Sequence, residues 1–464
     1  MVRAMCPIWP LHIVILYILA LCPIWVMCQS APNLLATFKP NNLSLHMEYY
    51  DFIDVEVKGD GLQPADEFQI KSRNRHVAYG DWNSTYRVDE AASNWKGRFQ
   101  VTAEFLGRTD LYLEVKRGTT EFPVNGTLPV TVLRPQRVID TIFTTSVALF
   151  VSLIFINFGC AMDWPTVKDV IRRPIGPLIG LCGQFLFMPL MCFGLGFLIF
   201  PTLPEMHLGM FCTGVAPGGG ASNIWTFVLG GNLNLSLAMT TISTLSAFGF
   251  MPLWLFSLGQ LLFRNANIAV PYQHIGMFVV GLVVPLAIGL AMQKFTPRLS
   301  AFMVRILKGF STLLLLFIIV FAIITNLYIF ELFTWEIVVA GMGVPWLGYI
   351  FGYLAGRVCR QPHADALAIS IETGITNTGI AIFLLRYTLP QPEADLTTVV
   401  PVSVAIMTPF PMMAIYMYQK IKACMGVSKT EESTRKSSKR VTTASYPPPS
   451  PSPQSSLPLM SSET

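Results

Sequence analysis

The sequence predicts a polytopic α-helical membrane protein with about nine transmembrane helices, preceded by a small β-rich domain. Of its 464 residues, 52% are hydrophobic and 13% are charged, and the mean hydropathy is +0.52. Soluble domains carry about 25% charged residues. From residue 140 onward, apolar runs of about 20 residues recur, which is the length that crosses a bilayer. The net charge of +5 is modest and requires no nucleic-acid partner.

The N-terminus has the pattern of a secretory signal peptide, which we place at residues 1–28. Arg3 supplies the positive charge, residues 11–27 form the apolar core, and small residues near Cys28 and Ser30 suit a cleavage site. The alternative is an uncleaved first transmembrane helix. In both cases the segment that follows is exported.

Residues 31–137 form a polar segment that predicts a small extracellular β-sandwich. Apolar and polar residues alternate along four stretches, which are 54–58, 99–105, 111–116 and 128–133. None of the nine cysteines lies in this segment, so it is not a disulfide scaffold. Three glycosylation sequons, expected only in an exported segment, begin at Asn42, Asn83 and Asn125. The segment could serve as a folding or sorting module, a spacer or a partner-binding module.

Residues 140–422 form the expected transmembrane domain, and residues 425–464 a disordered tail. The tail is rich in Lys and Arg, then in Ser and Pro, and this composition cannot bury a core. The expected spans are 141–161, 175–200, 206–229, 233–262, 275–293, 301–326, 335–356, 364–387 and 397–420.

The basic residues predict the orientation of these spans. Cytoplasmic loops are enriched in Lys and Arg. The connections on one side contain Lys168, Arg172, Arg173, Lys294, Arg298, Arg305, Lys308, Arg357 and Arg360, whereas those on the other contain mainly Arg264 and Arg386. The basic side is therefore expected to be cytoplasmic, with the C-terminus inside and residues 31–137 outside. The plasma membrane is the expected location.

Glu372 is a carboxylate in an otherwise apolar run. Burying an unpaired carboxylate in a membrane costs about 3 kcal/mol on insertion scales, so such a residue usually faces a partner. No Lys or Arg lies near it in the sequence, which makes a cation the natural partner. The neighbouring residues 373–379 contain two glycines and would let a helix open and turn its carbonyl groups toward that cation.

The third expected span is interrupted in the same way. Pro217 is followed by three glycines and then by Ser222 and Asn223. Proline removes a backbone donor, and glycine loosens a helix. Small residues also serve plain helix packing, but glycine-interrupted spans in corresponding halves are typical of a transporter binding site.

Side-chain oxygens gather around both interruptions and suit sodium, a hard cation that prefers oxygen ligands. Ser236 and Thr240 are spaced i, i+4 and share one helix face. Singly, a Ser or Thr in a helix usually bonds its own backbone, so only the cluster points to a cation. The candidates are Ser222, Asn223, Ser236, Thr240, Glu372, Thr373, Thr376 and Asn377.

At these residues the chain resembles the bile acid:sodium symporter family, solute carrier family ten. The resemblance covers about residues 140–422. It is carried by 157–163 (NFGCAMD), 184–189 (QFLFMP), 217–223 (PGGGASN), 231–236 (GNLNLS) with Thr240, and 372–374 (ETG). The leader and the β-rich domain look like the orphan branch of the family, whose transport substrates are unsettled.

The resemblance implies a core and a panel built from inverted repeats, with two broken helices crossing in the core and sodium bound at the crossing. By motif position, a first sodium site would use Ser222, Asn223, Ser236, Thr240 and Glu372. A second would use Gln184, Glu372, Thr373, Ile375 and Thr376. The family usually has glutamine at the position of Thr376, and threonine cannot reach as far, so the second site departs from the pattern.

Three functions compete. The first is a sodium-coupled symporter of an organic anion or a sterol-like or bile-acid-like solute, with sodium as coupling ion and no other cofactor. Arg386 or Arg264 at the outer edge could meet a substrate anion, although the plainer interpretation is that they only flank spans. The second is a transporter-like receptor or regulator that acts through its exported domain. The third, an intramembrane enzyme, lacks a second acid, a nucleophile–base pair and a metal-ligand set beside Glu372, so the chain is expected not to be an enzyme.

Overall fold

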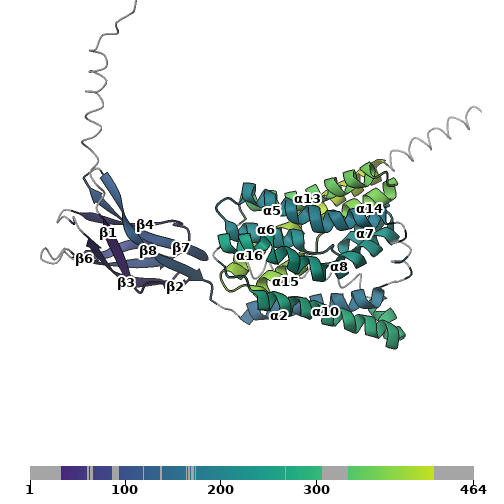
Figure 1. Ribbon diagram of the computed structural model, residues 1–464, viewed down its shortest axis with the longest axis horizontal. Coiled ribbons are helices and arrows are strands. Elements are labelled where there is room, and N and C mark those ends of the chain that lie inside the picture. The colour runs from purple at the N-terminus through teal and green to yellow at the C-terminus, as the bar shows by residue number, and fades with distance from the viewer. Residues whose placement is uncertain are drawn as a thin grey trace, which may run out of the picture.

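The computed structural model describes residues 33–422, apart from 306–332 and shorter gaps that fall within 60–65, 86–93 and 163–173 and at 119, 136–137 and 267. The described residues form a β-domain followed, end to end, by a bundle of helices (Figure 1). The expected signal peptide, the expected tail and most of the expected span 301–326 lie outside the described residues.

The β-domain is one continuous curled sheet, not the two separate sheets of the expected sandwich. Along the sheet the strands follow the order β4-β7-β8-β1-β3-β6-β5, and β2 pairs with β8. The long strand β8 continues the sheet because it pairs with β7 and β2 and also with β1, at Leu35 and Asn125. The two ends of the sheet meet where Trp82 Nε1 donates to the Phe68 carbonyl oxygen at 2.8 Å. The strands are β1 (Leu34–Lys39), β2 (Leu43–His46), β3 (Tyr50–Gly59), β4 (Glu67–Ser72), β5 (Ala78–Thr85), β6 (Asn94–Ala103), β7 (Gly107–Arg117) and β8 (Thr120–Leu133).

Apolar side chains that alternate with polar ones along the strands fill the inside of this domain. Phe99, Leu111, Leu113 and Leu128 are fully buried, as expected when successive side chains point to opposite faces. The four stretches in which the sequence alternates lie in or overlap β3, β6, β7 and β8. Two of the sequon asparagines, Asn42 and Asn125, are exposed.

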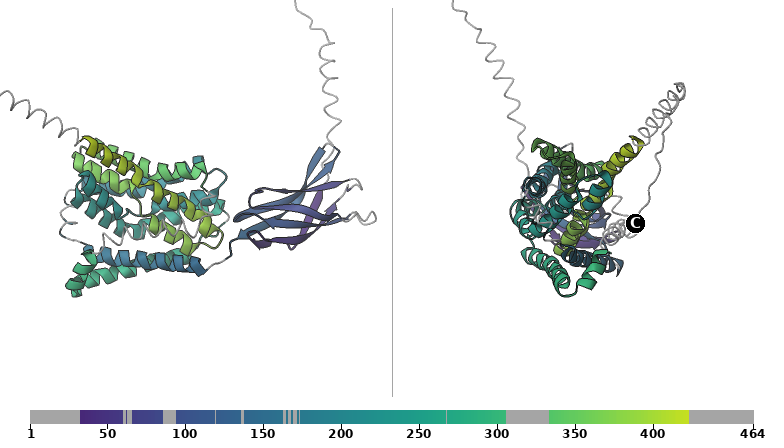
Figure 2. Two further views of the ribbon diagram at one scale, coloured as in Figure 1. Left: turned by 180° about the vertical axis from the view of Figure 1, so that it is seen from behind. Right: turned by 90° about the vertical axis from the view of Figure 1, so that its right-hand side faces the viewer.

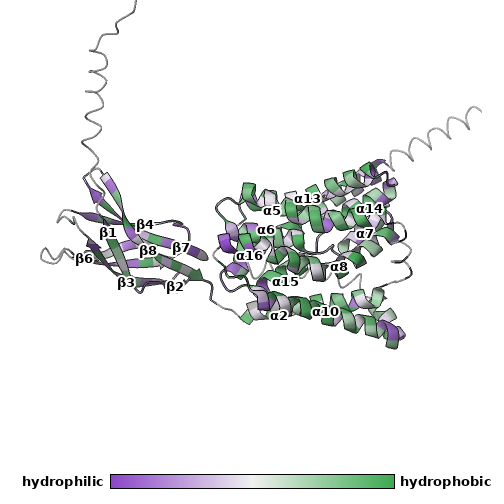
Figure 3. Ribbon diagram, in the orientation of Figure 1, coloured by the Kyte–Doolittle hydropathy of each residue, from purple (hydrophilic) through white to green (hydrophobic). Residues whose placement is uncertain are grey.

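The helical part contains five helices, among the described residues, that are long and apolar enough to cross a membrane. Hydrophobic residues run along these helices, and hydrophilic residues gather toward the ends of the bundle (Figure 3). The five are Ile175–Ile199, Leu233–Phe256, Tyr272–Phe295, Trp335–Val358 and Glu393–Lys422.

The helices are α2 (Val138–Ala161), α4 (Ile175–Cys182), the π-helix η2 (Gly183–Phe187), α5 (Met188–Ile199), α6 (Pro204–Val215), α7 (Ala221–Leu229), α8 (Leu233–Phe256), α9 (Leu258–Asn265), α10 (Tyr272–Phe295), α13 (Trp335–Val358), α14 (His363–Gly374), α15 (Thr378–Thr388) and α16 (Glu393–Met407). After a turn at Thr408, a further helix covers 409–422 and completes the last span.

Helices α2 and α10 form a separate layer along one side of the bundle (Figures 1 and 2). Their backbones approach closely because glycines face each other. A β-carbon on Gly159 would collide with the Leu286 carbonyl oxygen, and one on Gly289 with the Ile156 carbonyl oxygen. Small residues permit such close contact between helices in a membrane. An apolar cluster that includes Phe155 joins this α2–α10 pair to α6, α8 and α15.

Candidate functional site

Two interrupted helices cross at the centre of the bundle. The first breaks between α6 and α7, at residues 216–220, and the second between α14 and α15, at residues 375–377. Gly219 N donates to the Ile375 carbonyl oxygen at 2.7 Å, and Asn377 N donates to the Pro217 carbonyl oxygen at 2.8 Å. Gly218 and Thr376 thereby form an isolated antiparallel bridge. Each break thus supplies hydrogen-bond partners to the other, as irregular backbone at membrane depth requires.

Glu372 lies in the last turn of α14 beside this crossing and is only 2% exposed. Ser222 Oγ, in the first turn of α7, donates to Glu372 Oε2 at 2.6 Å. Ser236 Oγ, on α8, lies 3.4 Å from the same oxygen. None of the described Lys, Arg or His side chains forms an ion pair with Glu372. The carboxylate is therefore held by hydroxyl groups from two other helices.

Asn223 and Thr240 extend this polar cluster. Ser236 Oγ also donates to Asn223 Oδ1 at 2.9 Å, and Thr240 Oγ1 lies 3.4 Å from that amide oxygen and 3.0 Å from the Ser236 carbonyl oxygen. Ser236 and Thr240 share one face of α8, as their spacing predicts. The structure thus brings together all five residues predicted for the first sodium site.

Gly218 faces the other carboxylate oxygen. A β-carbon at Gly218 would collide with Glu372 Oε1. Within the described residues, this oxygen is buried and lacks a hydrogen-bond partner. The absence of a side chain at Gly218 therefore makes room for this carboxylate oxygen at the crossing.

The residues predicted for the second site also lie at the crossing, but several of their groups already have partners. Thr373 Oγ1 donates to the Ile369 carbonyl oxygen at 2.8 Å, and the Ile375 carbonyl oxygen accepts from Gly219. Gln184, on the π-helix η2, donates through Nε2 to the Ala216 carbonyl oxygen at 2.7 Å. Among the described groups, Gln184 Oε1 and Thr376 Oγ1 are buried without hydrogen-bond partners, as Glu372 Oε1 is.

Oxygens that are buried without protein partners are rare in folded proteins, and such an oxygen is ordinarily a ligand of a bound ion or water. The oxygens here belong to one carboxylate, one amide and one hydroxyl, which are hard ligands. The residues present therefore fit a sodium ion, and the fit rests on the donor types and on the oxygens without partners.

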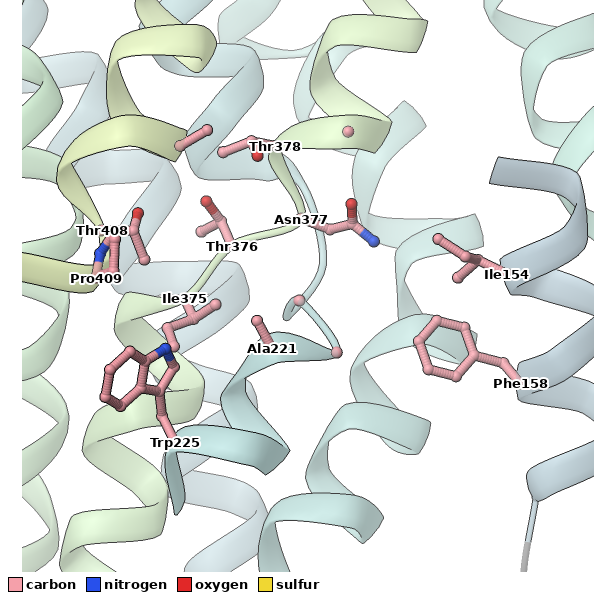
Figure 4. A pocket seen from close by; sticks show the side chains of 14 residues that line it. Ile154, Phe158, Ala221, Trp225, Ile375, Thr376, Asn377, Thr378, Thr408 and Pro409 are labelled. Atoms are coloured by element: carbon pink, nitrogen blue, oxygen red, sulfur yellow. The ribbon is translucent and has the colours of Figure 1, made fainter. Parts of the chain in front are cut away.

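A cavity of about 100 Å³ lies between the crossing and α2. Ile154 and Phe158 project from α2 toward Ala221 and Asn377 at the crossing, and Trp225 lies on the α7 side (Figure 4). The first residue of α7 and the first residue of α15 both line the cavity. Two helix N-termini, which carry partial positive charge, therefore border this space.

Charged residues at the end of the bundle nearest the β-domain form pairs that the sequence analysis missed. Arg386, which the sequence placed at an outer edge as a possible contact for a substrate anion, instead lies 2.9 Å from Asp395 and is 6% exposed. Arg108 Nε lies 2.7 Å from Glu393 Oε1, and Arg134 Nε lies 3.5 Å from Asp395 Oδ2. Arg108 and Arg134 are far in the sequence from their partners, and Arg386 lies on a different helix from Asp395, so no local pattern indicated these pairs.

The sequence of the helical part matches a known family of proteins. Residues 148–331 match the Sodium Bile acid symporter family. The chain is 30% identical over 275 residues to the sodium-dependent organic anion transporter of Rattus norvegicus, a match that covers 58% of this chain and 72% of that protein. The chain belongs to the sodium bile acid symporter family.

Other members of the sodium bile acid symporter family are similar over the same region. The chain is 28% identical over 297 residues to the ileal sodium/bile acid cotransporter of Cricetulus griseus, covering 84% of it. It is 32% identical over 270 residues to the P3 protein of Homo sapiens and covers 56% of that relative, a little over half its length. Among solved structures, domains 4 and 5 of the S-layer protein SbsC align with 22% of this chain at 17% identity and a TM-score of 0.15, too slight a likeness to indicate a shared fold.

Family membership settles the broad class of this chain. It is a multi-pass integral membrane protein of a family of secondary transporters, not an enzyme. Sodium coupling is a property of the family, which supports sodium as the coupling ion.

Proposed function

We propose that this protein is a sodium-coupled symporter of an organic anion, with a sterol-like or bile-acid-like solute as the leading class. The observation that carries the proposal is Glu372, a buried carboxylate held by Ser222 from a second broken helix and lacking a partner at Oε1 among the described groups. A carboxylate in this setting is stabilised by a cation. The names of two relatives, a sodium/bile acid cotransporter and a sodium-dependent organic anion transporter, support the same substrate class.

In this proposal, a first sodium ion is bound by Ser222, Asn223, Ser236, Thr240 and Glu372. A second is bound by Gln184, Glu372, Thr373, Ile375 and Thr376. The first set is the stronger, because the Ser222 and Ser236 hydroxyls both contact Glu372 Oε2, and Ser236 also contacts the Asn223 amide oxygen. The second set is weaker, because the Thr373 hydroxyl and the Ile375 carbonyl oxygen already have protein partners.

An anionic solute suits the cavity beside the crossing. The N-termini of α7 and α15 border it, and partial positive charge at a helix N-terminus stabilises an anion. Ile154, Phe158 and Trp225 supply apolar surface for the body of such a solute. Each net positive charge that moves inward gains about 2.3 kcal/mol per 100 mV of membrane potential, and two sodium ions carried with one monovalent anion move one such charge.

The full topology is part of the proposal. The chain has nine spans in inverted repeats, with the broken helices as the third and eighth. The β-domain is extracellular and glycosylated at Asn42, Asn83 and Asn125, and the C-terminus lies in the cytoplasm at the plasma membrane. The distribution of Lys and Arg between the connections supports this orientation.

The test is an uptake assay in cells that express the full chain, using a panel of bile acids, sulfated sterols and other organic anions, in sodium and in potassium medium. We expect at least one solute to enter in a sodium-dependent way, and Glu372→Gln to abolish that component at unchanged surface expression. Glu336→Gln, which alters a partly buried carboxylate in the first turn of α13, is the matched control. Sodium-dependent uptake that survives in the Glu372 variant would sink the assignment.

A further inference from the structure

The β-domain is attached to the helical bundle in two ways, on two different groups of helices. Its last strand, β8, ends at Leu133, and α2 begins at Val138, so only residues 134–137 join the domain to the α2–α10 pair. Four residues span at most about 14 Å. The covalent attachment to α2 is therefore short.

The second attachment is to the other group of helices. Leu106, between β6 and β7, is 2% exposed and belongs to one apolar cluster with residues of α5, α6, α13 and α16, including Met206 and Leu396. Phe105 and Met47 pack against the same cluster. The tip of the β-domain is thus part of a hydrophobic core that it shares with the helices around α16.

Ion pairs strengthen this second attachment at the start of α16. Glu393 is 1% exposed and pairs with Arg108 on β7 at 2.7 Å. Asp395 has no exposed surface and lies between Arg134, at the start of the linker, and Arg386, on α15. Breaking a buried pair leaves an uncompensated charge, so these contacts resist separation far more than surface pairs do.

Arg134 shortens the part of the connection to α2 that is free to move. Because this residue is 8% exposed and pairs with Asp395 of α16, only residues 135–137 lie between a point fixed to α16 and the start of α2. Four residue steps from Arg134 to Val138 span at most about 14 Å, so the start of α2 stays within that distance of Arg134 while the pair with Asp395 holds.

The cavity at the crossing makes such a displacement relevant. It measures about 100 Å³ and is closed on one side by Ile154 and Phe158 of α2. Pockets for drug-sized ligands measure about 300–1,000 Å³. A solute of sterol size therefore fits only after this space widens, and α2 is one of the walls that can move.

We propose that the β-domain is a strap that restrains the α2–α10 pair. It is covalently joined to α2, and Arg108 and Arg134 fasten it to Glu393 and Asp395 of α16. While both ion pairs are intact, the strap holds α2 against the crossing and the cavity stays small. Release of the pairs lets α2 swing outward. This role of the β-domain is additional to transport. It rests on the proposed function in one respect, which is that a transported solute requires the cavity to open.

The test measures access to the cavity without sodium or solute. In a background with Ile154→Cys, the full chain in phosphatidylcholine nanodiscs reacts with a bulky hydrophilic maleimide, and mass spectrometry follows labelling at position 154. We expect Arg108→Gln and Arg134→Gln each to raise the labelling rate at least threefold. The matched control is Arg98→Gln, which breaks an exposed pair with Asp54 inside the β-domain and leaves the rate unchanged.

If Arg134→Gln lowers expression, Arg108→Gln alone provides the test, because Arg108 is 43% exposed and its substitution disturbs the fold less. Amide hydrogen exchange at β3 and β6 verifies that the domain remains folded. Labelling that is unchanged or slower in both variants overturns the strap. Because labelling needs neither sodium nor a solute, that result leaves the symporter proposal standing. A failed uptake assay with faster labelling supports the strap and overturns only the symporter proposal.

Discussion

Ser222 at the start of α7 donates a 2.6 Å hydrogen bond to Glu372 at the end of α14, and this bond joins the two broken helices through their side chains. The residues are 150 positions apart in the sequence. Their backbones are joined separately, through Gly219 with Ile375 and through Asn377 with Pro217. The carboxylate is thus part of the connection between the helices as well as a candidate cation ligand.

Ser222→Ala is expected to weaken sodium binding about tenfold or more, whereas Thr376→Val changes it less than threefold. A hydrogen bond to a charged group contributes about 1.5–3 kcal/mol, and the Ser222 hydroxyl contacts the carboxylate directly. Thr376 belongs only to the second set of ligands, which is the weaker of the two, so its removal is expected to matter less. Sodium titrations of uptake or of thermal stability measure both values. A larger effect at Thr376 would instead favour the second site as the dominant one.

Gly218→Ala is expected to lower stability by about 1–3 kcal/mol and to abolish the sodium response. The added methyl group would overlap Glu372 Oε1 and displace it from the crossing. Gly249→Ala on α8 is the control, because a β-carbon there meets nothing within 4 Å. Thermal unfolding of the purified variants, with and without sodium, separates the two effects. If both alanine variants had the same stability and the same sodium response, Gly218 would not be needed to make room for the carboxylate.

Asp66→Asn is expected to destabilise the β-domain by about 1–3 kcal/mol. The Asp66 side chain is buried and accepts two hydrogen bonds from Arg117, at 2.6 and 2.8 Å, which also raise the pKa of Arg117. Truncating one partner leaves the other unsatisfied. Hydrogen exchange of β4 and β7 amides in the full chain measures the change. Asp54→Asn, which alters an exposed pair, should stay within about 0.5 kcal/mol.

The sequence was sufficient to find the candidate site because its signals are local. A lone carboxylate in an apolar run singles out Glu372, and Pro217 with the following glycines marks the second break. The i, i+4 spacing of Ser236 and Thr240 places both on one helix face. Each of these patterns follows from the cost of exposing charge or free backbone to lipid.

Local sequence patterns could not predict the contacts between segments that are distant in the sequence. The pairing of Arg108 with Glu393 joins residues almost 300 positions apart, and an exposed arginine on a strand usually has no structural role. The continuity of the sheet was missed because the length of β8 does not reveal that it pairs with β1 as well as with β7 and β2. The π-helix that carries Gln184 likewise has no distinguishing composition.

The most direct test of sodium binding at the crossing is the thermal stability of the purified chain in detergent as sodium replaces potassium at constant ionic strength. A ligand that binds only the folded state adds about 1.4 kcal/mol for each tenfold rise in concentration above its Kd. The account predicts that the melting temperature of the unmutated chain rises with sodium and that Glu372→Gln shows no rise. An equal rise in both proteins, or no rise in the unmutated chain, would contradict it.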